Sequence, residues 1–83
     1  MTIEKVGEFI GKKKQENALV KISFKIRSSV TGTFIKAPDF DELGKKNFWR
    51  IVIASNAAAY NETRDMNLCR IFNGAEFKKL ELV

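Results

Sequence analysis

The chain contains no histidine, one cysteine and one proline. Without histidine, and with Cys69 as the single thiol, it can form neither an intramolecular disulfide nor a zinc site of the usual ligands. Ser28 and Ser29 have no histidine to activate them, and Cys69 lies in an apolar run without an evident base. We therefore expect a non-enzymatic protein that has no catalytic residues, no metal and no cofactor.

Long apolar runs are also missing. No segment approaches the length that a membrane-spanning helix needs, and the first residues lack the apolar core of a secretory signal. A single unpaired cysteine suits a reducing compartment. We expect a cytoplasmic protein that does not enter the membrane.

The residues that are abundant point to one small packed domain. Of the 83 residues, 45% are hydrophobic and seven are phenylalanine, which is enough apolar surface for a core without disulfides or metal. The length allows only one domain, residues 1–83. The net charge of +5 favours a polyanionic partner but does not require one.

The N-terminal segment, residues 1–15, has the pattern of an amphipathic helix. Thr2 is a good N-cap, Glu4 suits the first turn, and the lysines at positions 12–14 suit the last turn. Apolar residues recur on one helical face: Ile3, Val6, Phe9 and Ile10. This helix is expected to pack on the rest of the domain.

Apolar and polar residues alternate at every position from Val20 to Arg27. A period of two predicts a strand with one buried face and one face in water. The face in water is basic and carries Lys21, Lys25 and Arg27.

Further strands are expected from apolar and β-branched runs at 30–35, 47–53, 68–72 and 77–83. Gly32 interrupts the first of these runs and indicates a bend or a close backbone approach. Residues 36–46 read as a solvated loop, whereas 54–67 leave a helical turn and a loop both open. Asn73 and Gly74 predict a two-residue turn into the last strand.

This order of elements predicts a mainly β domain. Residues 18–83 are expected to form a five-stranded, strongly bent SH3-type barrel, because closing the sheet removes exposed strand edges. The helix of residues 1–15 is expected to cover one open end of that barrel.

Three segments resemble the Sm-like family of small β-barrels. Residues 30–35 (VTGTFI) resemble the second strand of that family with its bending glycine. Residues 47–51 (NFWRI) are similar to the third strand, which begins with asparagine, and residues 70–74 (RIFNG) are similar to the second motif of the family. The resemblance covers nearly the whole chain by the order of its elements.

The resemblance implies a ring of subunits that binds RNA. Residues matching Asn47 and Asn73 would lie in loops at the central pore and contact an RNA base and its neighbours. The segments 68–72 and 77–82 would be the interface strands, the former of one subunit pairing with the latter of the next.

From charge and resemblance we predict that RNA or another single-stranded nucleic acid binds at Asn47, Asn73, Lys45, Lys46, Arg70, Lys21, Lys25 and Arg27. An ordinary solvated charged face explains the same lysines and arginines without a ligand. The alternative function is a protein-interaction or self-assembly module that offers a strand edge or an apolar groove and binds no nucleic acid. The acids at 39, 41 and 42 are interpreted as a solvated loop, since they fall short of a metal site.

Overall fold

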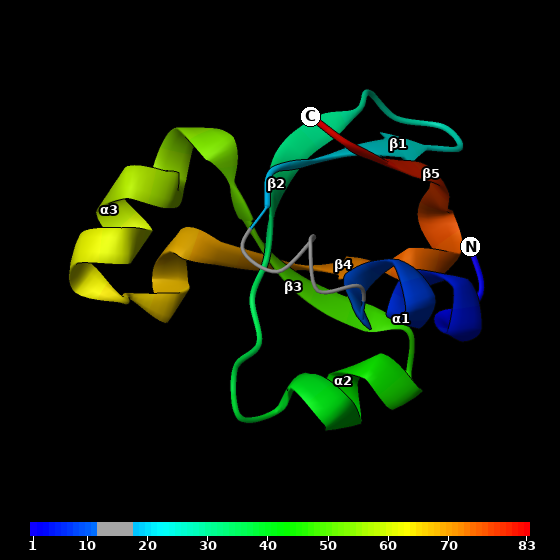
Figure 1. Cartoon of the computed structure of the whole chain (residues 1–83), viewed down its shortest axis with the longest axis horizontal. Helices are drawn as coiled ribbons and strands as arrows, with labels where there is room; N and C mark the ends of the chain where they lie inside the picture. Colours follow the sequence, from blue (N-terminus) through cyan, green and yellow to red (C-terminus); the bar gives the residue numbers. More distant parts are fainter. Residues whose placement is uncertain (12–17) are drawn as a thin grey trace.

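The computed structural model describes residues 1–11 and 18–83 (Figure 1). Its helices and strands are, in chain order, α1 (Ile3–Gly11), β1 (Val20–Phe24), β2 (Val30–Phe34), α2 (Phe40–Lys45), β3 (Phe48–Ile53), α3 (Ala57–Thr63), β4 (Cys69–Asn73) and β5 (Phe77–Leu82). Short 3-10 turns are η2 (Ala54–Asn56), η3 (Met66–Leu68) and η4 (Gly74–Glu76). The predicted N-terminal helix and five strands are confirmed.

The five strands form one antiparallel sheet in the order β4-β3-β2-β1-β5. β4 and β5 are therefore the two edge strands, and within residues 1–11 and 18–83 no ladder joins them. The domain is about 40% helix and 35% strand, so it contains more helix than the expected mainly β domain. The additional helices are α2 and α3, which lie at different ends of β3 (Figure 1).

One face of the sheet and one face of α1 enclose the core. The core side chains come from α1 and all five strands: Val6, Ile10, Val20, Ile22, Phe24, Phe34, Trp49, Ile51, Phe72, Phe77 and Leu80. Each large apolar side chain buried there stabilises the fold by roughly 1.5–3 kcal/mol relative to exposure. The amphipathic interpretation of the N-terminal segment is confirmed, because Val6 and Ile10 are both buried.

The start of α1 has the predicted cap. The Thr2 hydroxyl accepts a hydrogen bond from the Lys5 N–H (3.2 Å), and the Thr2 carbonyl accepts one from the Val6 N–H (3.1 Å). The helix reaches Gly11. The rest of the predicted helix, residues 12–15, and with it the lysines at 12–14, lies outside the described residues.

The first strand is shorter than its sequence pattern, since β1 ends at Phe24 instead of continuing through 20–27. The register with β5 shifts just before Phe24, and the Lys25 N–H donates to the Glu76 carbonyl (3.0 Å). The chain thereby leaves the ladder and bends. Ile26 follows the alternating pattern in the sequence but is 99% exposed.

The expected loop at 36–46 contains the helix α2. Phe40 packs edge-to-face on Trp49, with ring centroids 5.9 Å apart. Asp41 lies in the first turn and Lys45 in the last, where each charge is favourable to the helix dipole. The loop prediction was wrong for the residues of α2. It interpreted the charged residues as a sign of a solvated loop and did not include the contact between Phe40 and Trp49.

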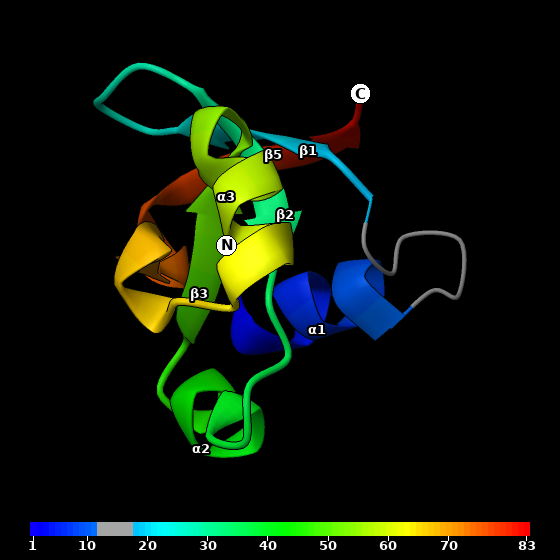
Figure 2. The ribbon, with the colours of Figure 1, turned by 90° about the vertical axis from the view of Figure 1, so that its left-hand side faces the viewer.

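The segment left open at 54–67 is mostly helical. It forms η2, α3 and η3, and α3 is capped by Arg64, which has the left-handed conformation (φ 55). Tyr60 of α3 is buried beside β3, where Val52 is also buried outside the main core. Figure 2 shows α3 in front of the sheet and apart from α1 and α2.

The connection between the last two strands differs from the predicted two-residue turn. The 3-10 turn η4 begins at Gly74 and carries the chain from one sheet edge to the other. The Asn73 side-chain oxygen accepts the Ala75 N–H (3.0 Å) and fixes the start of this turn. The hairpin prediction was wrong, because a strong local turn signal does not determine which strands pair.

Candidate binding groove

The orientation of the β4 backbone follows from two hydrogen bonds of its neighbour β3. The Arg50 carbonyl accepts the Ile35 N–H (2.9 Å), on the side of β3 that faces β2. The Asn47 carbonyl accepts the Gly74 N–H (2.7 Å), on the side that faces β4. Because backbone groups alternate sides along a strand, the odd-numbered residues of β3 point their N–H and C=O groups toward β4.

In the ladder between β3 and β4, Phe72 lies opposite Trp49 and Arg70 lies opposite Ile51. Phe72 and Arg70 therefore direct their backbone groups toward β3. Ile71, which lies between them, directs its N–H and C=O away from the sheet. β4 thus presents an open hydrogen-bonding edge.

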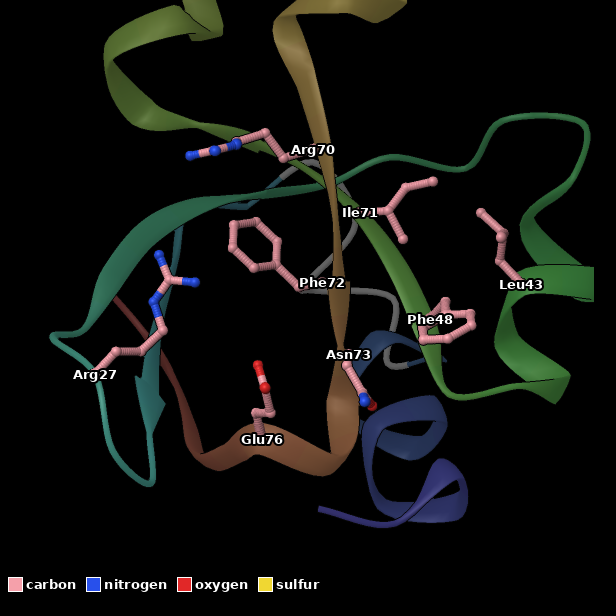
Figure 3. Close-up of a pocket in the computed structure, with 8 residues that line it drawn as sticks. All are labelled: Arg27, Leu43, Phe48, Arg70, Ile71, Phe72, Asn73 and Glu76. Atoms are coloured by element: carbon pink, nitrogen blue, oxygen red, sulfur yellow. The ribbon is translucent and has the colours of Figure 1, made fainter.

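A groove of about 520 Å³ lies along this edge (Figure 3). It is lined by Arg27, Leu43, Phe48, Arg70, Ile71, Phe72, Asn73 and Glu76, and we call it the β4 groove. Figure 3 shows Arg27, Arg70 and Phe72 on one side of the strand and Ile71, Leu43 and Phe48 on the other. The groove therefore has an arginine side and an apolar side, separated by the open backbone edge.

The arginine side is built on two phenylalanine rings. The Arg27 guanidinium lies 5.0 Å from the ring centroid of Phe24 and 5.7 Å from that of Phe72, both within the range of a cation–π contact. Arg70 extends from β4 on the same side and is exposed. Neither arginine forms an ion pair with any described residue, so both positive charges are available to a ligand.

The apolar side is partly open to solvent. Ile71 is 51% exposed, and Leu43 and Phe48 are half-buried. These side chains come from β4, α2 and β3, so the surface depends on the position of α2 against the sheet. An exposed apolar surface beside an unpaired strand edge is a feature of interaction sites.

Of the predicted contact residues, Arg27, Arg70 and Asn73 line the β4 groove, with Asn73 on the opposite side of the strand from the two arginines (Figure 3). Lys25 lies next to it, in a smaller groove of about 380 Å³ that shares Arg27 and Glu76 with the first. The sequence pattern had placed Lys25 and Arg27 on one strand face, but they lie in the bend after β1.

The other predicted lysines lie elsewhere. Lys45 lines a separate groove of about 490 Å³ between α1 and α2. Lys46 is the exposed C-cap of α2, and Lys21 is exposed on β1. These three lysines line neither the β4 groove nor the smaller groove next to it.

The side chain of Asn47 forms two hydrogen bonds within the domain. It sits in the left-handed conformation (φ 63), which asparagine tolerates better than most residues. Its Nδ2 donates to the Met1 carbonyl (3.0 Å), and its Oδ1 accepts the Trp49 Nε1–H (2.8 Å). These contacts favour a structural role for Asn47 over the RNA contact that the resemblance implied.

Five groove residues were absent from the predicted site: Leu43, Phe48, Ile71, Phe72 and Glu76. Ile71 carried a signal in the sequence, because Arg70, Ile71 and Phe72 break the alternation expected of a strand with one wet face. Leu43 and Phe48 carried none, since their place depends on α2, which was expected to be a loop.

A bidentate ion pair joins α2 to the sheet. Arg50 donates from Nη1 to Asp39 Oδ1 (2.5 Å) and from Nη2 to Oδ2 (3.1 Å). The hydrogen bond from Arg50 holds the pKa of Asp39 below its ordinary value of 3.8. Asp39 immediately precedes α2, so the pair helps to position the helix that supplies Leu43.

This pair predicts a loss of stability in acid. Because the pKa of Asp39 is lower in the folded state than in the unfolded state, the unfolded state binds more protons at pH values between the two pKa values. The ion pair therefore stabilises the fold above about pH 4, and this contribution is lost as the pH drops through the folded pKa. We expect Asp39→Asn to flatten this part of the pH dependence. Urea unfolding at about pH 7 and about pH 3 measures the difference, and parallel curves for wild type and Asp39→Asn would contradict the assignment.

The described residues hold no group of three or more His, Cys, Asp or Glu side chains arranged to bind a metal. None of the described helices is both long and apolar enough to span a bilayer. Burial raises the pKa of the Cys69 thiol, which disfavours the reactive thiolate. Comparisons with models of protein families, with curated proteins and with solved structures found no match for this chain.

Proposed function

We propose that this chain is a non-enzymatic protein-interaction module that binds an extended segment of a partner protein as an added strand on β4. The observation that carries the proposal is the outward-facing backbone of Ile71, which lies between the apolar side and the arginine side of the β4 groove. Strand addition takes its affinity from main-chain hydrogen bonds and its specificity from the side chains that flank the edge. The β4 groove offers both.

The proposed fold family rests on the arrangement of the strands. The sheet order β4-β3-β2-β1-β5, the leading helix and the close approach at Gly32 support an SH3-type barrel of the Sm-like kind. α3, between β3 and β4, is an addition to the elements of that pattern. Among the described residues no ladder joins β4 to β5, so the proposed barrel is open between these two edge strands.

The variant Ile71→Pro tests strand addition directly. Proline removes the outward N–H of this edge strand without removing a hydrogen bond to β3, so the fold is expected to survive. Ile71→Ala is the matched control, because it also loses the exposed side chain but keeps the N–H. We expect wild type and Ile71→Ala to enrich peptides from a displayed random library, and Ile71→Pro to enrich none.

Two further measurements make this test decisive. Circular dichroism establishes that Ile71→Pro is folded. If it is not, the strongest selected peptide is synthesised with N-methyl groups at alternate positions, since strand addition predicts that one of the two patterns abolishes binding. Equal binding of both N-methylated peptides, or no enrichment by the wild type, would overturn the proposal.

Nucleic acid is the second candidate ligand, because Arg27 and Arg70 lie on the same side of one groove. Guanidinium groups contact phosphates and stack on unpaired bases. The wild type, Arg70→Ala and Ile71→Pro are therefore titrated with labelled single-stranded RNA at increasing salt concentrations. Binding that weakens steeply with salt, is reduced by Arg70→Ala and is unchanged by Ile71→Pro would select nucleic acid in place of a protein strand.

A second copy of the chain is another possible source of the added strand, through β5 at the opposite edge. Leu82 is 49% exposed there, but Lys78 is also exposed on β5 and would bring positive charge toward Arg27 and Arg70, whereas Lys79 is paired with Glu81 (3.6 Å). Light scattering separates the cases. A monomer that binds peptide supports a foreign segment, whereas a concentration-dependent oligomer disrupted by Ile71→Pro would point to self-assembly.

A further inference from the structure

We infer that the segment added to β4 alternates acidic and apolar side chains, with an apolar residue opposite Ile71 and an acidic residue on each side of it. This inference rests on the strand-addition function proposed above. It specifies the chemistry of the partner, which the open edge alone does not.

The alternation follows from strand geometry. In a sheet, side chains directly opposite one another on paired strands lie on the same face. A ligand residue opposite Ile71 therefore faces the apolar side, where Leu43 and Phe48 also lie. Ligand residues opposite Arg70 and Phe72 face the arginine side.

The arginine side calls for carboxylates. The Arg27 guanidinium is held against two phenylalanine rings, so less side-chain freedom remains to be lost when it binds a ligand. The groove lining contains two arginines and one acid, Glu76, and neither arginine is neutralised by an ion pair within the described part of the chain. A carboxylate accepts two parallel hydrogen bonds from a guanidinium, and a lysine in the same place would be repelled.

The apolar side calls for a branched or aromatic residue. The half-exposed Ile71 side chain and the half-buried Leu43 and Phe48 lose water when an apolar side chain covers them. A charged ligand residue at this position would be desolvated without a partner, because the charged residues of the groove lie on the other side of β4 or at its end.

The peptides enriched by the wild-type protein provide the first test. We expect Asp or Glu at alternate positions and apolar residues between them. Peptides that depend on the Ile71 N–H but show no acidic preference would overturn this inference while leaving strand addition intact. No enriched peptide at all would overturn both, so the two failures are distinguishable.

A charge exchange at Arg70 provides the second test. The probes are a short peptide of alternating Glu and Ile and the same peptide with Lys in place of Glu. We expect Arg70→Glu to weaken the binding of the Glu peptide by about tenfold or more, because an attraction becomes a repulsion. The same variant is expected to bind the Lys peptide more tightly than the wild type does, because a repulsion becomes an attraction. Arg70 is exposed, so the variant is expected to fold.

Lys21→Glu is the matched control for this exchange. It makes the same change in net charge at an exposed position of β1 that does not line the β4 groove. We expect it to change the affinity for either peptide by less than about threefold at moderate salt. Equal effects of Arg70→Glu and Lys21→Glu would show that net charge alone acts, and would overturn the inference.

Discussion

Gly32→Ala is expected to lower the free energy of unfolding by about 3 kcal/mol or more, which is a large part of the stability of a domain this small. A Cβ at position 32 would lie 2.5 Å from the carbonyl oxygen of Val52 and 2.8 Å from Cγ2 of Ile51. Gly32 of β2 is paired with β3, so the strands would have to separate to admit a methyl group. The sequence-based expectation of a close backbone approach at Gly32 is confirmed.

The matched control is Gly7→Ala. A Cβ at Gly7 would have no neighbour within 4 Å, and the residue lies inside α1. Alanine there is expected to raise stability by about 0.5–1 kcal/mol, because it restricts the unfolded chain and favours the helix. Urea unfolding of both variants measures the contrast. A free energy of unfolding for Gly32→Ala within about 0.5 kcal/mol of the wild-type value would contradict the packing of β2 on β3.

Asn47→Ala is expected to lower the free energy of unfolding by about 3 kcal/mol. The change removes the acceptor of the Trp49 indole N–H and the donor to the Met1 carbonyl, and it places alanine at φ 63. Asn47 also borders Gly74, whose N–H donates to the Asn47 carbonyl. The residue therefore joins the N-terminal segment, the start of β3 and the turn η4.

Two replacements separate the contributions of Asn47. Glycine keeps the left-handed backbone but loses the amide, and aspartate keeps the acceptor for Trp49 but loses the donor to Met1. We expect alanine to be the most damaging of the three. Denaturation followed by the fluorescence of Trp49 measures the series. An Asn47→Ala protein that keeps its stability and loses RNA binding would restore the contact role implied by the Sm-like resemblance.

Local features of the chain were largely predictable. The cap at Thr2 and the apolar face of α1 depend on residues within a few positions of one another, and so does the alternation that marks β1. Trp49 and Ile51 were expected in a strand and are buried in β3. These features follow from the period of side-chain directions, which the sequence specifies directly.

Predictions failed where local and distant contacts competed. Ile26 continues the alternating pattern, yet the shift in register against β5 and the bond from Lys25 to Glu76 end the strand before it. Phe40 lies in a polar segment, and its packing on Trp49 stabilises α2 there. In both cases a residue distant in sequence decides the local structure.

The candidate site was only partly predictable for the same reason. Arg27 and Arg70 were selected as basic residues, but nothing local indicated that they flank one strand edge or that Phe72 lies beneath Arg27. Asn47 matched a family motif, and only the contacts with Met1 and Trp49 indicate its structural role.

The sequence by itself excluded histidine-dependent chemistry through its composition. It also determined the leading amphipathic helix and the number of strands. Tertiary structure alone decided that β4 is an edge strand and that its open side lies between arginines and apolar side chains. The physical reason is that side-chain periodicity is a property of neighbouring residues, whereas an edge is defined by the strands that fail to pair with it.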